Sequence, residues 1–193
     1  MDHLTELLKQ SSARHDHLCP RQVLGVRMGL AGLRLLGLEA PISKKTGLVI
    51  IETDGCFADG IEVATGSVIG HRTLRINDLG KIAATMINVQ TGKAIRFSPQ
   101  PDVRDRAVIY APEMKTRYYA QLHGYQSMPE SELIRHQKVI LQPSLTDILS
   151  RPNARVKCSR CEEEIINERQ IHINGVLLCR SCANLGYYQL PNT

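Results

Sequence analysis

Four cysteines near the C-terminus have the spacing of a tetrahedral metal site. Cys158 and Cys161 form one C-x2-C pair and Cys179 and Cys182 form a second, which gives the pattern C-x2-C-x17-C-x2-C. A two-residue gap lets both thiolates of a pair bind one ion at about 2.3 Å per Zn–S bond. Four protein ligands leave no position open for water or substrate. The pattern therefore predicts a structural zinc site, with disulfides or unrelated free thiols as the alternatives.

The two remaining cysteines lie near histidines and could form a second site. Cys19 belongs to the run His15-Asp16-His17-Leu18-Cys19-Pro20, and Cys56 follows Thr53-Asp54-Gly55. In an extended segment alternate side chains share one side, so His15, His17 and Cys19 could converge. The alternative interpretation is that both cysteines are small buried hydrophobic residues and that the histidines are solvated.

The donor types in this second cluster match zinc, which binds nitrogen and sulfur ligands. We predict that His17, Cys19 and Cys56 bind a second transition metal, zinc, with His15 as the fourth ligand if the site is closed. Three ligands would leave one position open, as in catalytic zinc sites. Asp59, one helical turn past Cys56, could orient a ligand or a bound water. Cys19, Cys56 and Asp59 are thus the candidate catalytic residues.

Both cysteines of this cluster should lie at the start of a helix. Pro20 suits the first helical position, which makes Cys19 the N-cap, and Cys56 lies between an apolar run and a helical pattern. Backbone N–H groups and the helix dipole at such positions favour the thiolate form.

The helix after Cys19 carries a stripe of glycines. Between Val23 and Leu36, Gly25, Gly29 and Gly32 fall within about 60° of one another, while Arg27 and Arg34 point to the opposite side. A glycine inside a helix costs about 1 kcal/mol relative to alanine. Three on one stripe therefore predict that another backbone approaches this helix closely.

The rest of the N-terminal region mixes helices with strands, which predicts an α+β core rather than a strict βαβ series. The expected strands are 47–52, a hairpin of 82–89 with 93–97, and 139–141; the expected further helices are 57–66, 102–110 and 130–136, with 145–149 as a last short core element. A polar linker, Ser150-Arg151-Pro152-Asn153, follows. We expect two domains, a core at 1–152 and a zinc finger at 153–193.

The finger should contain a hairpin and a short helix. Gly175 suits the turn between Ile171–Ile173 and Val176–Leu178, and Cys182–Leu185 has the pattern of a helical run. A cysteine knuckle, a hairpin and a helix carrying the second cysteine pair resemble a treble-clef finger.

Charge and composition disfavour several classes of function. From Asn153 to Thr193 there are five basic and four acidic residues, so four thiolates on a divalent ion bring the finger to about −1. Nucleic-acid fingers normally present a basic face, and aromatic residues for base stacking make up only 4% of the chain, with no Trp. No phosphate-binding glycine loop or G-x-S-x-G motif is present.

The sequence also bears on the compartment. The first residues lack the basic and apolar regions of a signal peptide, and the longest apolar stretch, Val23–Leu38, is interrupted by two arginines and too short to span a bilayer. We expect a cytoplasmic protein without membrane contact, in which reducing conditions favour metal over disulfide.

Several blocks together resemble one family. The run from His15 to Pro20, the block from Thr53 to Gly66, and Thr91-Gly92-Lys93-Ala94 are similar to the FmdE family, which comprises the FmdE component of formylmethanofuran dehydrogenase and its free-standing relatives. His17, Cys19, Cys56 and Asp59 match that pattern. Asp16 and Arg21 stand where the family has glycine, and Ser67 where it often has cysteine.

The resemblance implies an α+β core with an appended treble-clef zinc finger, a homodimer, and a link to the molybdenum or tungsten enzyme of methanogenesis and one-carbon metabolism. One hypothesis is therefore a metal-binding accessory subunit that docks onto larger oxidoreductase subunits. The other is a small stand-alone metal- or thiol-dependent enzyme that uses Cys19, Cys56 and His17. The substrate stays open in both.

Overall fold

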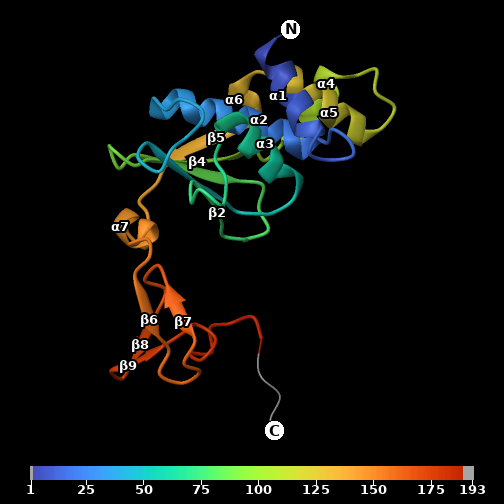
Figure 1. Ribbon diagram of the computed structural model, residues 1–193. Coiled ribbons are helices and arrows are strands. Elements are labelled where there is room, and N and C mark those ends of the chain that lie inside the picture. The colour runs from blue at the N-terminus through green and yellow to red at the C-terminus, as the bar shows by residue number, and fades with distance from the viewer. Residues whose placement is uncertain (1, 189–193) are drawn as a thin grey trace. The chain divides into compact units, whose positions relative to one another are not determined.

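A computed structural model describes residues 2–188 of the chain (Figure 1). It divides into two compact units, Met1–Leu141 and Gln142–Thr193. The division falls before helix α7 (Leu145–Leu149). None of the α7 residues is buried, so the expectation of a last core element there was wrong. Arg169 of the second unit donates a hydrogen bond to the carbonyl oxygen of Ile148 at 3.3 Å, which ties α7 to that unit.

A five-stranded mixed sheet forms one layer of the first unit. Its strands lie in the order β2 (Leu74–Ile76), β1 (Gly47–Ile51), β3 (Ala84–Asn88), β4 (Ala94–Pro99) and β5 (Ile134–Lys138). Only β1 and β2 run parallel; the other neighbours are antiparallel. The predicted first strand and the predicted hairpin at β3 and β4 are confirmed.

Helices pack against this sheet around α2 (Pro20–Leu36), which contacts β3 and β4 as well as α1, α3 and α5. The other helices of the unit are α1 (His3–Ser12), α3 (Cys56–Thr65), α4 (Val103–Tyr110), α5 (Arg117–Ser127) and α6 (Glu130–Leu133). Val23, Val26 and Met28 of α2 are completely buried. The mixed architecture confirms the predicted α+β core.

The glycines of α2 allow backbone contact with α3, as the stripe predicted. A Cβ built on Gly25 would lie 2.5 Å from the carbonyl oxygen of Phe57, and one on Gly60 would lie 2.3 Å from that of Gln22. A Cβ on Gly29 would lie 2.6 Å from the Cβ atom of Ala64. The first turns of the two helices are therefore held close together. Gly66, in the left-handed conformation, ends α3 as expected.

Two predictions near the end of the core were wrong. The segment 130–136 is helical only to Leu133, because Ile134–Lys138 pairs with the free edge of β4 instead. The segment 139–141 is not a strand, and Ile140 is 93% exposed. Pairing with β4 and burial of Ile134 override the local helical pattern. The sequence patterns did not predict helices α1 and α5 or strand β2.

The second unit contains two small antiparallel hairpins, β6 (Arg155–Lys157) with β7 (Glu164–Ile166) and β8 (Ile171–Ile173) with β9 (Val176–Leu178). Its small core consists of Cys158, Ile165 and Leu178. Asn174 and Gly175 have positive φ, so the predicted turn between β8 and β9 is confirmed. The helix expected at Cys182–Leu185 is not formed: in the described part of the chain, this region has turns.

No helix within residues 2–188 has the length and apolar character needed to cross a membrane.

Candidate metal centres and the core cavity

The four C-terminal cysteines come together at one point. Cys158 and Cys161 lie in the turn between β6 and β7, and Cys179 and Cys182 follow β9. Their four sulfur atoms all lie within 4.8 Å of one another, and the Sγ atoms of Cys161 and Cys179 are 3.9 Å apart. This donor set could hold one metal ion.

Backbone amides around this cluster stabilise a negative charge on its sulfurs. The amide of Cys179 donates to Sγ of Cys158 at 3.3 Å, and that of Cys182 donates to Sγ of Cys179 at 3.4 Å. Backbone N–H groups of Cys161 and Cys179 lower the pKa of Cys158 to about 6. Desolvation and neighbouring thiols raise the pKa of Cys182 to about 12, so the sulfurs cannot all ionise easily without a compensating cation. The cluster therefore fits a divalent ion with a preference for thiolate ligands.

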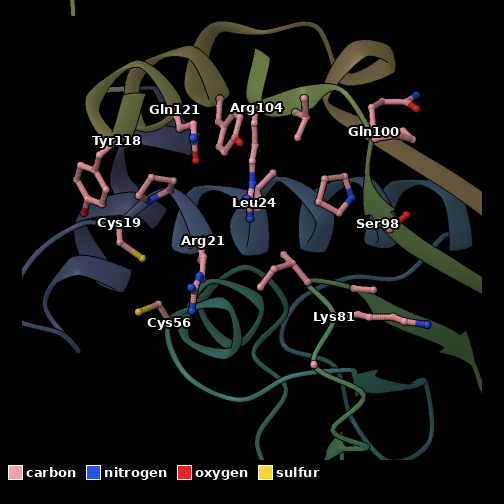
Figure 2. Close-up of a pocket in the computed structure, with 18 of the residues that line it drawn as sticks. Cys19, Arg21, Leu24, Cys56, Lys81, Ser98, Gln100, Arg104, Tyr118 and Gln121 are labelled. Atoms are coloured by element: carbon pink, nitrogen blue, oxygen red, sulfur yellow. The ribbon is translucent and has the colours of Figure 1, made fainter. Parts of the chain in front are cut away.

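The contact between α2 and α3 brings the two core cysteines together. Cys19 is the N-cap of α2, as predicted, and its backbone N–H donates to Oε1 of Gln22 at 2.7 Å. Cys56 is the first residue of α3. The thiol of Cys56 is close enough to that of Cys19 to contribute to raising its pKa, and both side chains line the same cavity (Figure 2). Residues separated widely in sequence thus meet at the starts of two packed helices.

His15 contacts Cys56 directly. Its Nε2 atom lies 3.3 Å from Sγ of Cys56, and its Nδ1 atom lies 3.5 Å from Oδ2 of Asp59. Asp59 lies one turn after Cys56 on α3, so both residues face the same loop. The next residue on this face, Glu62, binds Arg14 at 2.6 Å and fixes the loop that carries His15. A carboxylate on one ring nitrogen commonly orients the other toward a metal.

His17 lies farther along the same loop. Its ring packs against that of His15 with centroids 5.6 Å apart, and its side chain lines a cavity that Cys19 and Cys56 also line. The structure thus brings His15, which was the optional ligand of the prediction, into contact with a thiol.

Burial governs the charge of Cys19. It raises the pKa of the Cys19 thiol, and this effect outweighs the backbone N–H groups of Gln22 and Arg21, which lower it. The net shift in the pKa of Cys19 is therefore opposite to the expected stabilisation of a thiolate by the helix start. Among the described residues, only the four C-terminal cysteines bring three or more ligand atoms of His, Cys, Asp or Glu within 4.8 Å. The core cluster is looser than that centre.

An open cavity of about 750 Å³ extends from this cluster over the core unit (Figure 2). Its walls come from the starts of α2, α3 and α4, from α5, and from the segments 80–83 and 96–101. Tyr118 of α5 closes one side and donates to the carbonyl oxygen of Leu18 at 3.4 Å. Arg21, Lys81 and Arg104 also line the cavity, which their positions in the sequence did not indicate. As single cations without a motif, they gave no signal.

Comparison with known proteins assigns the core unit. The family model described as "FmdE, Molybdenum formylmethanofuran dehydrogenase operon" matches residues 14–151. The chain belongs to the FmdE family. The FmdE match includes the core cysteines, both histidines and the residues that line the cavity, whereas the four C-terminal cysteines lie beyond it.

Two individual proteins are also similar to this FmdE chain. A "Probable S-adenosyl-L-methionine-binding protein" of Archaeoglobus fulgidus is 38% identical over 96 residues, which are 48% of this chain and 26% of that protein. The chain thus matches about a quarter of that relative's length. A protein from Syntrophus aciditrophicus, described as a "tungsten formylmethanofuran dehydrogenase subunit e (fmde)-like protein", superposes with a TM-score of 0.58 at 18% identity. The superposition covers 96% of this chain and 95% of the other. The likeness shows a shared fold.

Proposed function

We propose that this chain is an FmdE-family protein that binds two metal ions. A structural zinc is bound by Cys158, Cys161, Cys179 and Cys182. A second transition metal, zinc, is bound in the core by Cys19, Cys56 and the histidines of the adjacent loop. The observation that carries the second site is the contact between Sγ of Cys56 and Nε2 of His15 at 3.3 Å, in a cavity wall that also includes Cys19.

The residues of the core cluster fit a metal with nitrogen and sulfur ligands. Asp59 holds the His15 ring with Nε2 toward the thiols, and burial of Cys19 excludes water from one side. A bound zinc ion would polarise a ligand oxygen or lower the pKa of a bound water. His17, Cys19 and Cys56 all line the cavity, so a ligand in the cavity can reach this cluster.

Within the cell, we propose that the protein is an accessory subunit or relative linked to a molybdenum or tungsten formylmethanofuran dehydrogenase, in one-carbon metabolism or methanogenesis. The family description and the name of the Syntrophus aciditrophicus protein support this role. The second candidate is a stand-alone metal- or thiol-dependent enzyme using Cys19, Cys56 and His17, which the open cavity beside the cluster favours. Co-purification from the native host separates the two: an accessory subunit should bring a molybdenum or tungsten oxidoreductase with it, and a stand-alone enzyme should not.

S-adenosylmethionine is a poor fit to this cavity. Among the described residues no carboxylate lines it, while four basic side chains do, so a sulfonium cation would find no counter-charge. The match covers only 26% of the relative from Archaeoglobus fulgidus, so its name does not assign a ligand to this cavity.

Elemental analysis tests the metal proposal. The wild-type protein should contain two metal ions per chain, Cys56→Ser should contain one, and Cys179→Ser should contain one from the other site. The two variants control for each other because each removes one thiol from one centre. A wild-type content of one ion that Cys56→Ser leaves unchanged would refute the core site.

A further inference from the structure

The cavity of the core unit is lined by charges of one sign. Arg21, Lys81, Arg96 and Arg104 contribute to its walls, and within the part of the chain that the structure describes neither Asp nor Glu does. The remaining polar lining includes Ser98, Gln100 and Gln121, which are neutral hydrogen-bonding groups. A cavity of this composition attracts anions because nothing in its described lining compensates the basic charge.

Arg96 differs from the other three cations because it already has a partner. Its Nε atom donates to Oε1 of Glu52 at 2.5 Å, and its Nη2 atom donates to Oε2 at 2.6 Å. Glu52 is buried, and its hydrogen bonds raise the pKa of Arg96. This pair is neutral overall and serves as a fixed part of the wall.

Arg21, Lys81 and Arg104 carry the excess charge. They come from the start of α2, the segment before β3, and the start of α4, and all three residues are exposed. Within residues 2–188, none of the three forms an ion pair with a carboxylate. Three side chains from separate elements therefore meet at one cavity with their charges available to a ligand.

The labelled side chains show how these charges lie relative to the thiols. In Figure 2, Arg104 extends from the α4 side toward the middle of the lining residues, and Arg21 is drawn on the same side of the view as Cys56. Lys81 lies at the opposite end from Cys19. A ligand that is bound by Arg104 and Arg21 would therefore extend from the middle of the cavity toward the core cluster.

We propose that this cavity binds a small organic anion, a carboxylate or a phosphate, through Arg21 and Arg104, with the rest of the ligand reaching toward Cys19 and Cys56. The inference deepens the proposed function, because the core metal would then contact the ligand's other end. Guanidinium groups suit this task since their planar donors match the two oxygens of a carboxylate or phosphate. A volume of about 750 Å³ is in the range of small-molecule sites.

Ligand titrations followed by amide chemical shifts test the proposal on the full-length protein as purified. The probes are succinate, inorganic phosphate and putrescine, a diamine of the same length class as succinate. Succinate or phosphate should shift amides of the cavity wall and saturate, and the tighter of the two identifies the anion class. Arg104→Gln should weaken that binding about tenfold or more, because a hydrogen bond to a charged group is lost.

Arg135→Gln is the matched control, since Arg135 is exposed on β5 of the same unit, lies outside the cavity, and gives the same change in net charge. It should leave the affinity for the anion unchanged. The proposal is overturned if neither anion saturates, if putrescine binds as well as succinate, or if Arg104→Gln and Arg135→Gln weaken binding equally. The metal content of the same sample is measured by elemental analysis. If the protein as purified holds no core metal but still binds the anion, the proposed metal centre is refuted and the anion site stays in place.

Discussion

Replacing Gly60 by alanine should separate α2 from α3 and thereby disturb the core cysteines. A Cβ at this position would lie 2.3 Å from the carbonyl oxygen of Gln22 and 2.9 Å from the backbone nitrogen of Val26. Both neighbours are backbone atoms, so rotation of a side chain cannot relieve the overlap. Overpacking of this kind costs about 1–3 kcal/mol, and two backbone contacts place Gly60→Ala near the upper end.

A second effect opposes this loss. Gly60 lies inside α3, where alanine is the better helix former by about 1 kcal/mol. The expected net loss is therefore about 2 kcal/mol in the free energy of unfolding of the core unit. For a unit of this size that loss corresponds to a decrease of about 4–8 °C in Tm.

Denaturant unfolding followed by circular dichroism measures the loss of stability, and elemental analysis of the same samples measures the effect on the core cysteines. Gly70→Ala is the control because a Cβ there meets nothing within 4 Å, and its stability should stay within about 0.5 kcal/mol of the wild type. Core metal should be lost or weakened in Gly60→Ala alone. If Gly60→Ala is as stable as the wild type or more stable, the gain in helix propensity outweighs any overlap. The close backbone contact then does not exist.

Three further predictions concern other parts of the chain. Cys179→Ser should release one zinc ion and loosen the segment after Asn153 while the circular dichroism of the core unit persists; unchanged zinc would exclude the tetracysteine site. Light scattering at micromolar concentration should report about twice 21.5 kDa, because apolar side chains such as Ile173 and Val176 are exposed; a monomer would argue against a dimer. Tyr125 is buried and its pKa is raised to about 12, so ultraviolet titration should show a tyrosine that ionises well above pH 10 and is missing in Tyr125→Phe. Since the folded pKa is the higher one, this tyrosine's contribution to stability is complete below pH 10 and is lost as the pH rises through 12.

Patterns of short range predicted most of the core's elements. The glycine stripe of α2 and the terminal Gly66 of α3 follow from backbone requirements that only glycine meets easily, and both were interpreted correctly. The segment after Glu130 could not be predicted in this way, because its conformation depends on the free edge of β4. The turns at Cys182–Leu185 likewise replace a helix that the local pattern alone suggested.

The candidate sites differ in the same respect. The spacing of the cysteines between positions 158 and 182 is that of a tetrahedral metal site, so the sequence predicts which sulfurs come together. In the core, the residue types were identified, but the contact of His15 with Cys56 joins a loop to α3 across 41 positions of the sequence. No periodicity encodes that contact. The basic cavity was missed entirely, since its cations come one by one from separate elements.

The two centres therefore depend on the fold in different ways. In the C-terminal unit, two cysteine turns set the distances between sulfurs, and a bound metal can organise the little structure that surrounds them. In the core, the distance between Cys19 and Cys56 is set by how closely α2 approaches α3, and Gly25 and Gly60 permit that approach. These glycines contact no ligand, but they determine how close the two core thiols can come. A change at either of them acts on the thiols through the position of a whole helix, which explains why the fold and the core site should be lost or kept together.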